Sequence, residues 1–198
     1  MENTVSWLLT NYIEIFGAAL GILGVYFQIK QNIWVWPLGI IASAFYIIVF
    51  FSAQLYALMS LQLYFIAISI YGWYQWKHPQ NQHKEKERPI IRLNLKNTMI
   101  YLILFIGLWL LLFLFFKFFT NDSSAVWDSV VTALSLVASL MLAKKFIEQW
   151  LVWILADSIA LVLYFFKQLY PTVIFYLILV VMAIIGFKQW KKEITSSA

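Results

Sequence analysis

Two indoles and a carboxylate recur at helical spacing in the last third of the chain. Trp150, Trp153 and Asp157 are separated by three and four residues, which places them on one face of a helix. An indole attracts a cation through its ring face, at roughly 0.5–2 kcal/mol. A carboxylate pairs with positive charge or accepts hydrogen bonds from hydroxyl groups. This face therefore predicts binding of a small cationic or aromatic ligand.

Asp157 lies within a predominantly apolar stretch of the sequence. Ionisable groups inside a membrane are expensive and usually mark a functional site. The structural alternative is that Asp157 hydrogen-bonds helices together while the two tryptophans lie at the membrane interface. We interpret Asp157, Trp153 and Trp150 as substrate-binding residues.

The composition places these residues in lipid. Of 198 residues, 63% are hydrophobic and 12% are charged, whereas soluble domains have about 45–50% and about 25%. The mean hydropathy is +0.81. Such a chain would expose a large apolar surface in water, so we expect a membrane protein. The absence of cysteine excludes disulfides, thiolate metal sites and cysteine nucleophiles.

The chain repeats itself with a shift of 114 residues. Residues 36–77 and 150–191 align without a gap, and thirteen of the 42 pairs are identical. The pairs include Trp36 with Trp150, the Gln-Leu-Tyr triplets at 54–56 and 168–170, and Gly72 with Gly186. A duplicated membrane unit is typical of transporters that bind substrate between their halves.

The repeat also shows where the halves differ. Ser43 matches Asp157, and Tyr46 matches Ala160; Gln62 matches Tyr176. Positions that face a shared cavity are free to diverge, so we add Ser43, Tyr46, Gln62 and Tyr176 to the predicted substrate-binding residues. Core packing is the alternative for each of them. No catalytic and no metal-binding residue is expected.

Seven stretches are apolar enough and near enough to the required length of about 20 residues to predict membrane-spanning helices. They cover approximately residues 9–29, 34–52, 55–76, 98–119, 125–143, 149–166 and 169–190. The predicted fold is therefore an all-α membrane protein with seven transmembrane helices in a 3+1+3 parallel-repeat arrangement. A first three-helix bundle would cover residues 9–77, a basic inner loop and connector helix residues 78–124, and a second bundle residues 125–192.

Charge sets the expected orientation. With the N-terminus outside and the C-terminus in the cytoplasm, twelve of the fourteen Lys and Arg residues lie on the inner side, and only Lys117 and Lys167 lie outside. This distribution fits the positive-inside rule. It also explains the net charge of +5 without nucleic acid. Trp76 and Trp190, each followed by lysine, are expected to be anchors at the inner interface.

Several kinds of chemistry are missing from the sequence. Both histidines, His78 and His83, lie in the basic loop. No metal-ligand cluster, phosphate-binding loop or hydrolase elbow is present. We therefore expect no enzyme activity and no cofactor. Glycines 17, 21 and 24 on the first span are typical of close helix packing, and the hydroxyls of Thr132, Ser135 and Ser139 form a stripe that packing also explains.

Taken together, the motifs resemble one family. W-P-L-G-I-I at 36–41, Y-G-W-Y-Q-W-K at 71–77, and W-x-x-W-x-x-x-D at 150–157 followed by K-Q-L-Y are similar to the PnuC-type vitamin transporters, the nicotinamide riboside transporter family. The resemblance covers residues 10–192. It implies a SWEET-like 3+1+3 fold, facilitated diffusion across a bacterial inner membrane, and a substrate site containing Trp150, Trp153 and Asp157. The proline tetrad of the SWEET sugar transporters is absent, which argues against a sugar.

The expected function is a membrane uniporter for a small cationic aromatic vitamin precursor. Nicotinamide riboside is the first candidate, thiamine is the alternative, and riboflavin is a third. The expected partners are the lipid bilayer and an intracellular vitamin kinase acting downstream; whether the chain acts as a homo-oligomer is left open. A membrane sensor or scaffold without transport is the alternative from a different class.

Overall fold

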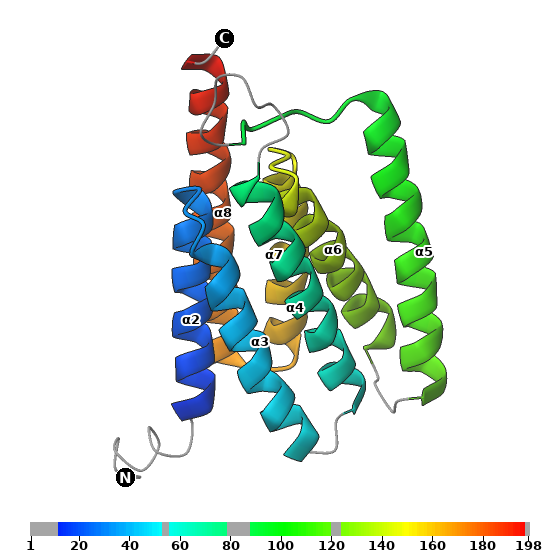
Figure 1. The fold of residues 1–198 in the computed structure, drawn as a ribbon. Helices are drawn as coiled ribbons and strands as arrows, with labels where there is room; N and C mark the ends of the chain where they lie inside the picture. The colour runs from blue at the N-terminus through cyan, green and yellow to red at the C-terminus, as the bar shows by residue number, and fades with distance from the viewer. Residues whose placement is uncertain (1–11, 53–55, 79–87, 120–123, 197–198) are drawn as a thin grey trace. The chain divides into compact units, whose positions relative to one another are not determined.

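The computed structural model describes residues 12–52, 56–78, 88–119 and 124–196. Within these ranges the chain forms seven helices and no strand, as Figure 1 shows. The helices are α2 (Tyr12–Ile29), α3 (Val35–Ser52), α4 (Tyr56–Lys77), α5 (Leu95–Phe119), α6 (Ala125–Ala143), α7 (Gln149–Phe166) and α8 (Tyr170–Ser196). The all-α prediction is confirmed, and each predicted span overlaps one of these helices.

Four of the described helices, α5 to α8, are long and apolar enough to cross a membrane. The apolar stretches Phe16–Ile29 in α2 and Val35–Phe51 in α3 are shorter. Helix formation agrees with composition, since the long runs of Leu, Ile, Val and Phe in these segments contain few glycines or prolines. Membrane crossing by α2, α3 and α4 stays a prediction.

The chain divides into two compact units, residues 1–70 and residues 71–198. The first contains α2, α3 and most of α4. The second contains the last turns of α4 together with α5 to α8. The predicted arrangement of two three-helix bundles joined by a connector stays a prediction.

In the second unit, α6 packs between α5 and α7, and α7 packs against α8. Small side chains allow this close packing, because Ala133, Ala138 and Ala143 of α6 have no exposed surface. Tyr101 of α5 packs with Val137, Met141 and Phe146 in a buried cluster. The Tyr101 and Phe146 rings meet edge to face, 5.7 Å between centroids.

The segment before α5 is tied to the turn between α6 and α7. The Ile91 amide donates to the Lys145 carbonyl and the Ile147 amide donates to the Ile91 carbonyl, both at 3.0 Å. The Glu148 carboxylate accepts a hydrogen bond from the Leu93 amide at 3.0 Å. This end of the unit is therefore fixed by main-chain pairing, and α5 begins from a defined position.

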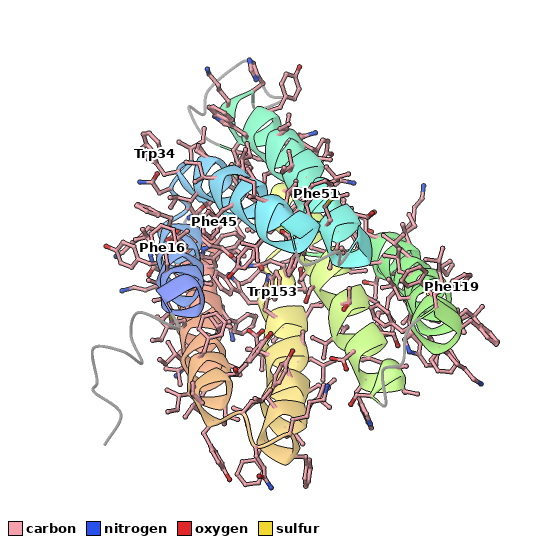
Figure 2. The ribbon with its side chains drawn as sticks, turned by 90° about the horizontal axis from the view of Figure 1, so that it is seen from below. Phe16, Trp34, Phe45, Phe51, Phe119 and Trp153 are labelled. Carbon is pink, nitrogen blue, oxygen red and sulfur yellow. The ribbon has the colours of Figure 1, made fainter. Side chains whose placement is uncertain are left out.

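Helix α5 presents apolar side chains around its surface. Leu95, Ile103 and Phe118 are each at least 70% exposed, and Phe119 at its end points away from α6 (Figure 2). A helix that is apolar on its exposed sides needs lipid as its surroundings. The role of α5 as a connector between two bundles stays a prediction.

In the first unit, α2 packs on α3. The rings of Phe16 and Phe45 meet edge to face at 6.0 Å (Figure 2). A Cβ added to Gly17 would lie 3.0 Å from the Tyr46 ring, so Gly17 is a close-packing position as predicted. The same prediction for Gly24 is wrong, because a Cβ there would meet no atom of the described residues within 4 Å.

The repeat extends to the hydrogen bonds of the turns. After α2, the Gln31 amide donates to the Gln28 carbonyl and the Asn32 amide to the Phe27 carbonyl; after α6, Lys145 donates to Leu142 and Phe146 to Met141. These are the two bonds of a Schellman motif, and the donors and acceptors match under the 114-residue shift. Gln31 and Lys145 both have left-handed backbones, with φ of 52° and 56°. The two turns are therefore duplicated structures.

The expectation for Trp76 and Trp190 is corrected by their burial. Trp190 has no exposed surface and Trp76 is only 6% exposed, whereas an interface anchor keeps part of its ring in the headgroup region. Trp190 packs on Trp150, and the Lys145 ammonium lies 4.6 Å from the centre of the Trp76 ring. Both tryptophans pack inside the protein because neighbouring elements cover them.

Candidate functional site

Helix α7 places the predicted site residues along one face. Trp150, Trp153, Asp157, Ala160 and Tyr164 follow each other at intervals of three and four residues, so their side chains project in similar directions. The α7 helix begins after the anchored turn that holds Glu148. This fixes where the face starts, and the helix itself sets the spacing of its residues.

Asp157 is buried, with 6% of its surface exposed. No described residue donates a hydrogen bond to its carboxylate or pairs a charge with it. A buried carboxylate without a partner is unfavourable unless something else satisfies it. The structural alternative, in which Asp157 bonds neighbouring helices together, therefore finds no partner in the described part of the chain.

Trp150 occupies a packing position. It is 1% exposed, and its ring meets that of Trp190 edge to face at 5.6 Å. A Cβ added to Gly186 of α8 would lie 2.5 Å from two atoms of the Trp150 ring. Trp150 thus fills the space between α7 and α8 where glycine permits close approach. Its predicted contact with a ligand stays a prediction, while this geometry supports a structural role.

Trp153 differs from Trp150, since part of its side chain stays exposed. Its indole Nε1 is buried and has no hydrogen-bond partner among the described residues. Because this group lies one turn from Asp157, a donor and an acceptor without partners stand near each other on α7. A ligand with hydroxyl groups and a flat ring could use both.

Tyr176 of α8 packs against the α7 face that carries Asp157. Its ring stacks on Tyr164 of α7, with 5.4 Å between centroids and 14° between planes. Asp157 is therefore bracketed along the α7–α8 interface by Trp150 with Trp190 on one side and by the two tyrosines on the other. Tyr164 was not among the predicted residues, although its spacing of seven from Asp157 could have identified it.

The end of α7 carries an ion pair. Lys167 Nζ lies 3.2 Å from Asp128 Oδ2 of α6 and 5.8 Å from the centre of the Tyr164 ring. Both charged side chains are partly exposed. The pair connects α6 with the aromatic end of the site.

The remaining predicted residues belong to the first unit. Ser43 and Tyr46 lie one turn apart on α3, and Gln62 lies on α4. Ser43 is 5% exposed, while Tyr46 and Gln62 are half-buried. Tyr46 stacks on Phe50 and lies against Gly17. The structure thus brings Trp150, Trp153, Asp157 and Tyr176 together in one unit, and Ser43 with Tyr46 on one face of α3.

The hydroxyl stripe of α6 bonds to its own helix. Thr132 donates to the Asp128 carbonyl at 2.7 Å, Ser135 donates to the Val131 carbonyl at 2.9 Å, and Ser139 donates to the Ser135 carbonyl. Such bonds satisfy the hydroxyls within the helix. The stripe agrees with the packing interpretation. Among the described residues, no group of three His, Cys, Asp or Glu could hold a metal ion.

The fold and this site define a helical membrane protein with a polar position buried between aromatic pairs. The chain belongs to the nicotinamide mononucleotide transporter family, because the sequence model of that family matches residues 11–192. It is 30% identical to the nicotinamide riboside transporter PnuC of Escherichia coli strain K12, over 91% of this chain and 85% of that protein.

Two further comparisons agree with this family. The riboflavin/roseoflavin transporter RibM of Streptomyces davaonensis is 21% identical, over 89% of this chain and 83% of that protein. A crystal structure of the vitamin B3 transporter PnuC shares the fold, with a TM-score of 0.74 and 19% identity over 98% of this chain and 88% of that chain.

Proposed function

We propose that this protein is a membrane transporter that takes up a vitamin precursor by facilitated diffusion, with nicotinamide riboside as its first candidate substrate. Family membership supports transport, and the E. coli relative carries nicotinamide riboside in its name. The observation that carries the proposal is Asp157, a buried carboxylate for which the described residues provide no hydrogen bond or ion pair. It lies one turn from Trp153, whose indole N–H also has no partner among the described residues.

The chemistry of this pair fits the proposed substrate. Nicotinamide riboside carries a positive heteroaromatic ring and a hydroxylated sugar. The ring is attracted to the Trp153 indole, and Asp157 pairs with the positive charge or accepts from the hydroxyls. Tyr176, which stacks on Tyr164 of the same α7 face, is a further proposed contact. Ser43, Tyr46, Gln62 and Trp150 are further proposed contacts.

Transport would follow from the duplicated architecture. The 3+1+3 arrangement provides two three-helix bundles, and rocking of one against the other would open the site to each side in turn. The proposed orientation has the N-terminus outside and the C-terminus in the cytoplasm, in a bacterial inner membrane. An intracellular kinase that phosphorylates the vitamin would make uptake one-way, and whether the transporter is a homo-oligomer is a separate question.

Thiamine is the second candidate. It also has a positive heteroaromatic ring, which Trp153 and Asp157 would bind by the same interactions. Riboflavin is a third candidate because a relative is named for its transport. A sensor or scaffold is the alternative class, in which the site would hold helices together and no vitamin would bind.

Calorimetric titration of the purified protein with nicotinamide riboside, thiamine and riboflavin tests the proposal. We expect binding of one cationic vitamin, and loss of that binding in a folded Asp157→Ala variant. Uptake of the same vitamin into proteoliposomes, without an imposed pH gradient, would then establish facilitated diffusion. Absence of binding for all three would contradict the proposed substrate class and favour the sensor or scaffold.

A further inference from the structure

Tyr164 occupies a position on the site face that the proposed function does not use. It lies seven residues beyond Asp157 on α7, which is two helical turns and about 10 Å along the axis. Tyr164 lies in the last turn of α7, close to the connection with α8. Any ligand at Asp157 would therefore have Tyr164 on that side.

The contacts of Tyr164 link it to both the site and the ion pair. Its ring stacks on Tyr176 of α8, at the α7–α8 end of the face that carries Asp157. On the other side, the Lys167 ammonium lies 5.8 Å from the Tyr164 ring centre while it pairs with Asp128. A continuous chain of contacts thus runs from α6, through Tyr164, to Tyr176.

The matching positions in the first repeat lack this arrangement. Phe50 matches Tyr164 and Ala53 matches Lys167. Phe50 stacks on Tyr46 of its own helix, at 5.7 Å and 22°, so it does not reproduce the pairing between helices. Because both repeats share the same turns, the scaffold alone does not require the Tyr164 arrangement. The stacking of Tyr164 on Tyr176 occurs in the repeat that carries Asp157.

We propose that Tyr164 is a positioning residue: it holds Tyr176 against α7 and, with Tyr176, covers the ligand from the α7–α8 end. The Asp128–Lys167 ion pair in turn holds the Tyr164 ring in place. The ligand part of this inference rests on the proposed function. Tyr164 acts through Tyr176 and contacts the ligand only as part of this cover.

Titration calorimetry with nicotinamide riboside tests the positioning role. Tyr164→Leu removes the aromatic pair and is expected to weaken binding roughly two- to twelvefold. Tyr164→Phe keeps the ring and is expected to retain most of the affinity. The matched control is Phe166→Leu, which removes an aromatic ring that is 78% exposed at the same end of α7. Equal losses for Tyr164→Leu and Phe166→Leu, or no loss for Tyr164→Leu, would overturn the inference.

A double-mutant cycle tests the ion pair. Lys167→Gln is expected to weaken binding in the native background and to have no further effect once Tyr164 is leucine, since its action passes through that ring. Fully additive losses would show that Lys167 acts independently of Tyr164 and would overturn this part.

Cysteine labelling gives a readout that needs no ligand. The chain contains no cysteine, so Asp157→Cys introduces a single thiol at the site. A charged methanethiosulfonate reagent should label it faster from the α7–α8 side when Tyr164 is leucine, by a factor similar to the affinity loss. An unchanged labelling rate would contradict the proposal that Tyr164 covers the site. Faster labelling in a protein that binds none of the vitamins would support the cover while contradicting the proposed substrate.

Discussion

The ring of Trp150 occupies the space that a side chain at Gly186 would need. A Cβ on Gly186 would lie 2.5 Å from two atoms of that ring, closer than atoms can approach. The two residues come from adjacent helices, and Trp190 closes the same contact from α8. The approach of α7 to α8, and with it the position of Asp157, depends on this pair.

Gly186→Ala is therefore expected to lower stability by about 1–3 kcal/mol, since overpacking forces the ring or the helix to move. Thermal unfolding of the detergent-solubilised protein measures this loss of stability. Gly24→Ala is the matched control, because a Cβ there meets no atom of the described residues within 4 Å and alanine favours the helix by up to about 1 kcal/mol. If both variants lost stability equally, the Trp150 contact would not be the cause.

The two tryptophans of the motif should separate into two roles. Trp153→Leu is expected to weaken binding of a cationic vitamin roughly two- to thirtyfold, the size of a cation–π interaction, with little change in melting temperature. Trp150→Ala is expected to destabilise the protein by about 3–5 kcal/mol, because a buried ring is removed. Calorimetry and thermal unfolding on both variants distinguish the roles. A folded Trp150→Ala variant that lost only affinity would contradict the packing assignment.

Asp157→Asn tests whether charge or shape is recognised. The amide keeps the size of the side chain and removes its charge, so affinity for a cationic vitamin is expected to fall by about ten- to hundredfold. Riboflavin, which is neutral, should be affected much less if it binds. Parallel titrations of the native protein and the variant measure the affinity for the cationic vitamin and for riboflavin. Unchanged binding of the cationic vitamin would show that Asp157 does not pair with its charge.

Substitution by glycine is expected to change stability differently in the two matched turns. Gln31 and Lys145 both have left-handed backbones, which are unfavourable for non-glycine residues by about 1–2 kcal/mol. Gln31→Gly should relieve this and stabilise by about 0.5–1 kcal/mol after the added flexibility of glycine in the unfolded chain. Lys145→Gly should not stabilise, because it also removes the contact with Trp76. Chemical denaturation of both variants checks the contrast; equal stabilisation would mean that the Lys145–Trp76 contact contributes nothing.

Orientation can be measured with single cysteines. Leu169→Cys, at the exposed turn between α7 and α8, should react with an impermeant maleimide added to intact cells, since the charge distribution places this turn outside. Ser196→Cys, at the end of α8, should react only after permeabilisation. The reverse pattern would contradict the proposed orientation with the N-terminus outside.

The sequence by itself determined the helices, the duplication and the α7 face. Long apolar runs with few breakers form helices in lipid wherever they occur, so the seven segments could be predicted from hydropathy. The spacing of Trp153 and Asp157 places them on one helical face whatever surrounds the helix. The matched turn bonds after α2 and α6 show that aligned sequence also meant aligned local structure.

The tertiary structure decided which residue lies opposite which. A sequence gives the periodicity of one helix and carries no direct record of the residue on its neighbour. For this reason Trp190 could be taken for an interface anchor, although it has no exposed surface and packs on Trp150 of α7. The stacking of Tyr164 on Tyr176 and the pairing of Lys167 with Asp128 likewise join different helices. These contacts depend on the distance and rotation of packed helices, which side-chain volumes at positions such as Gly186 set.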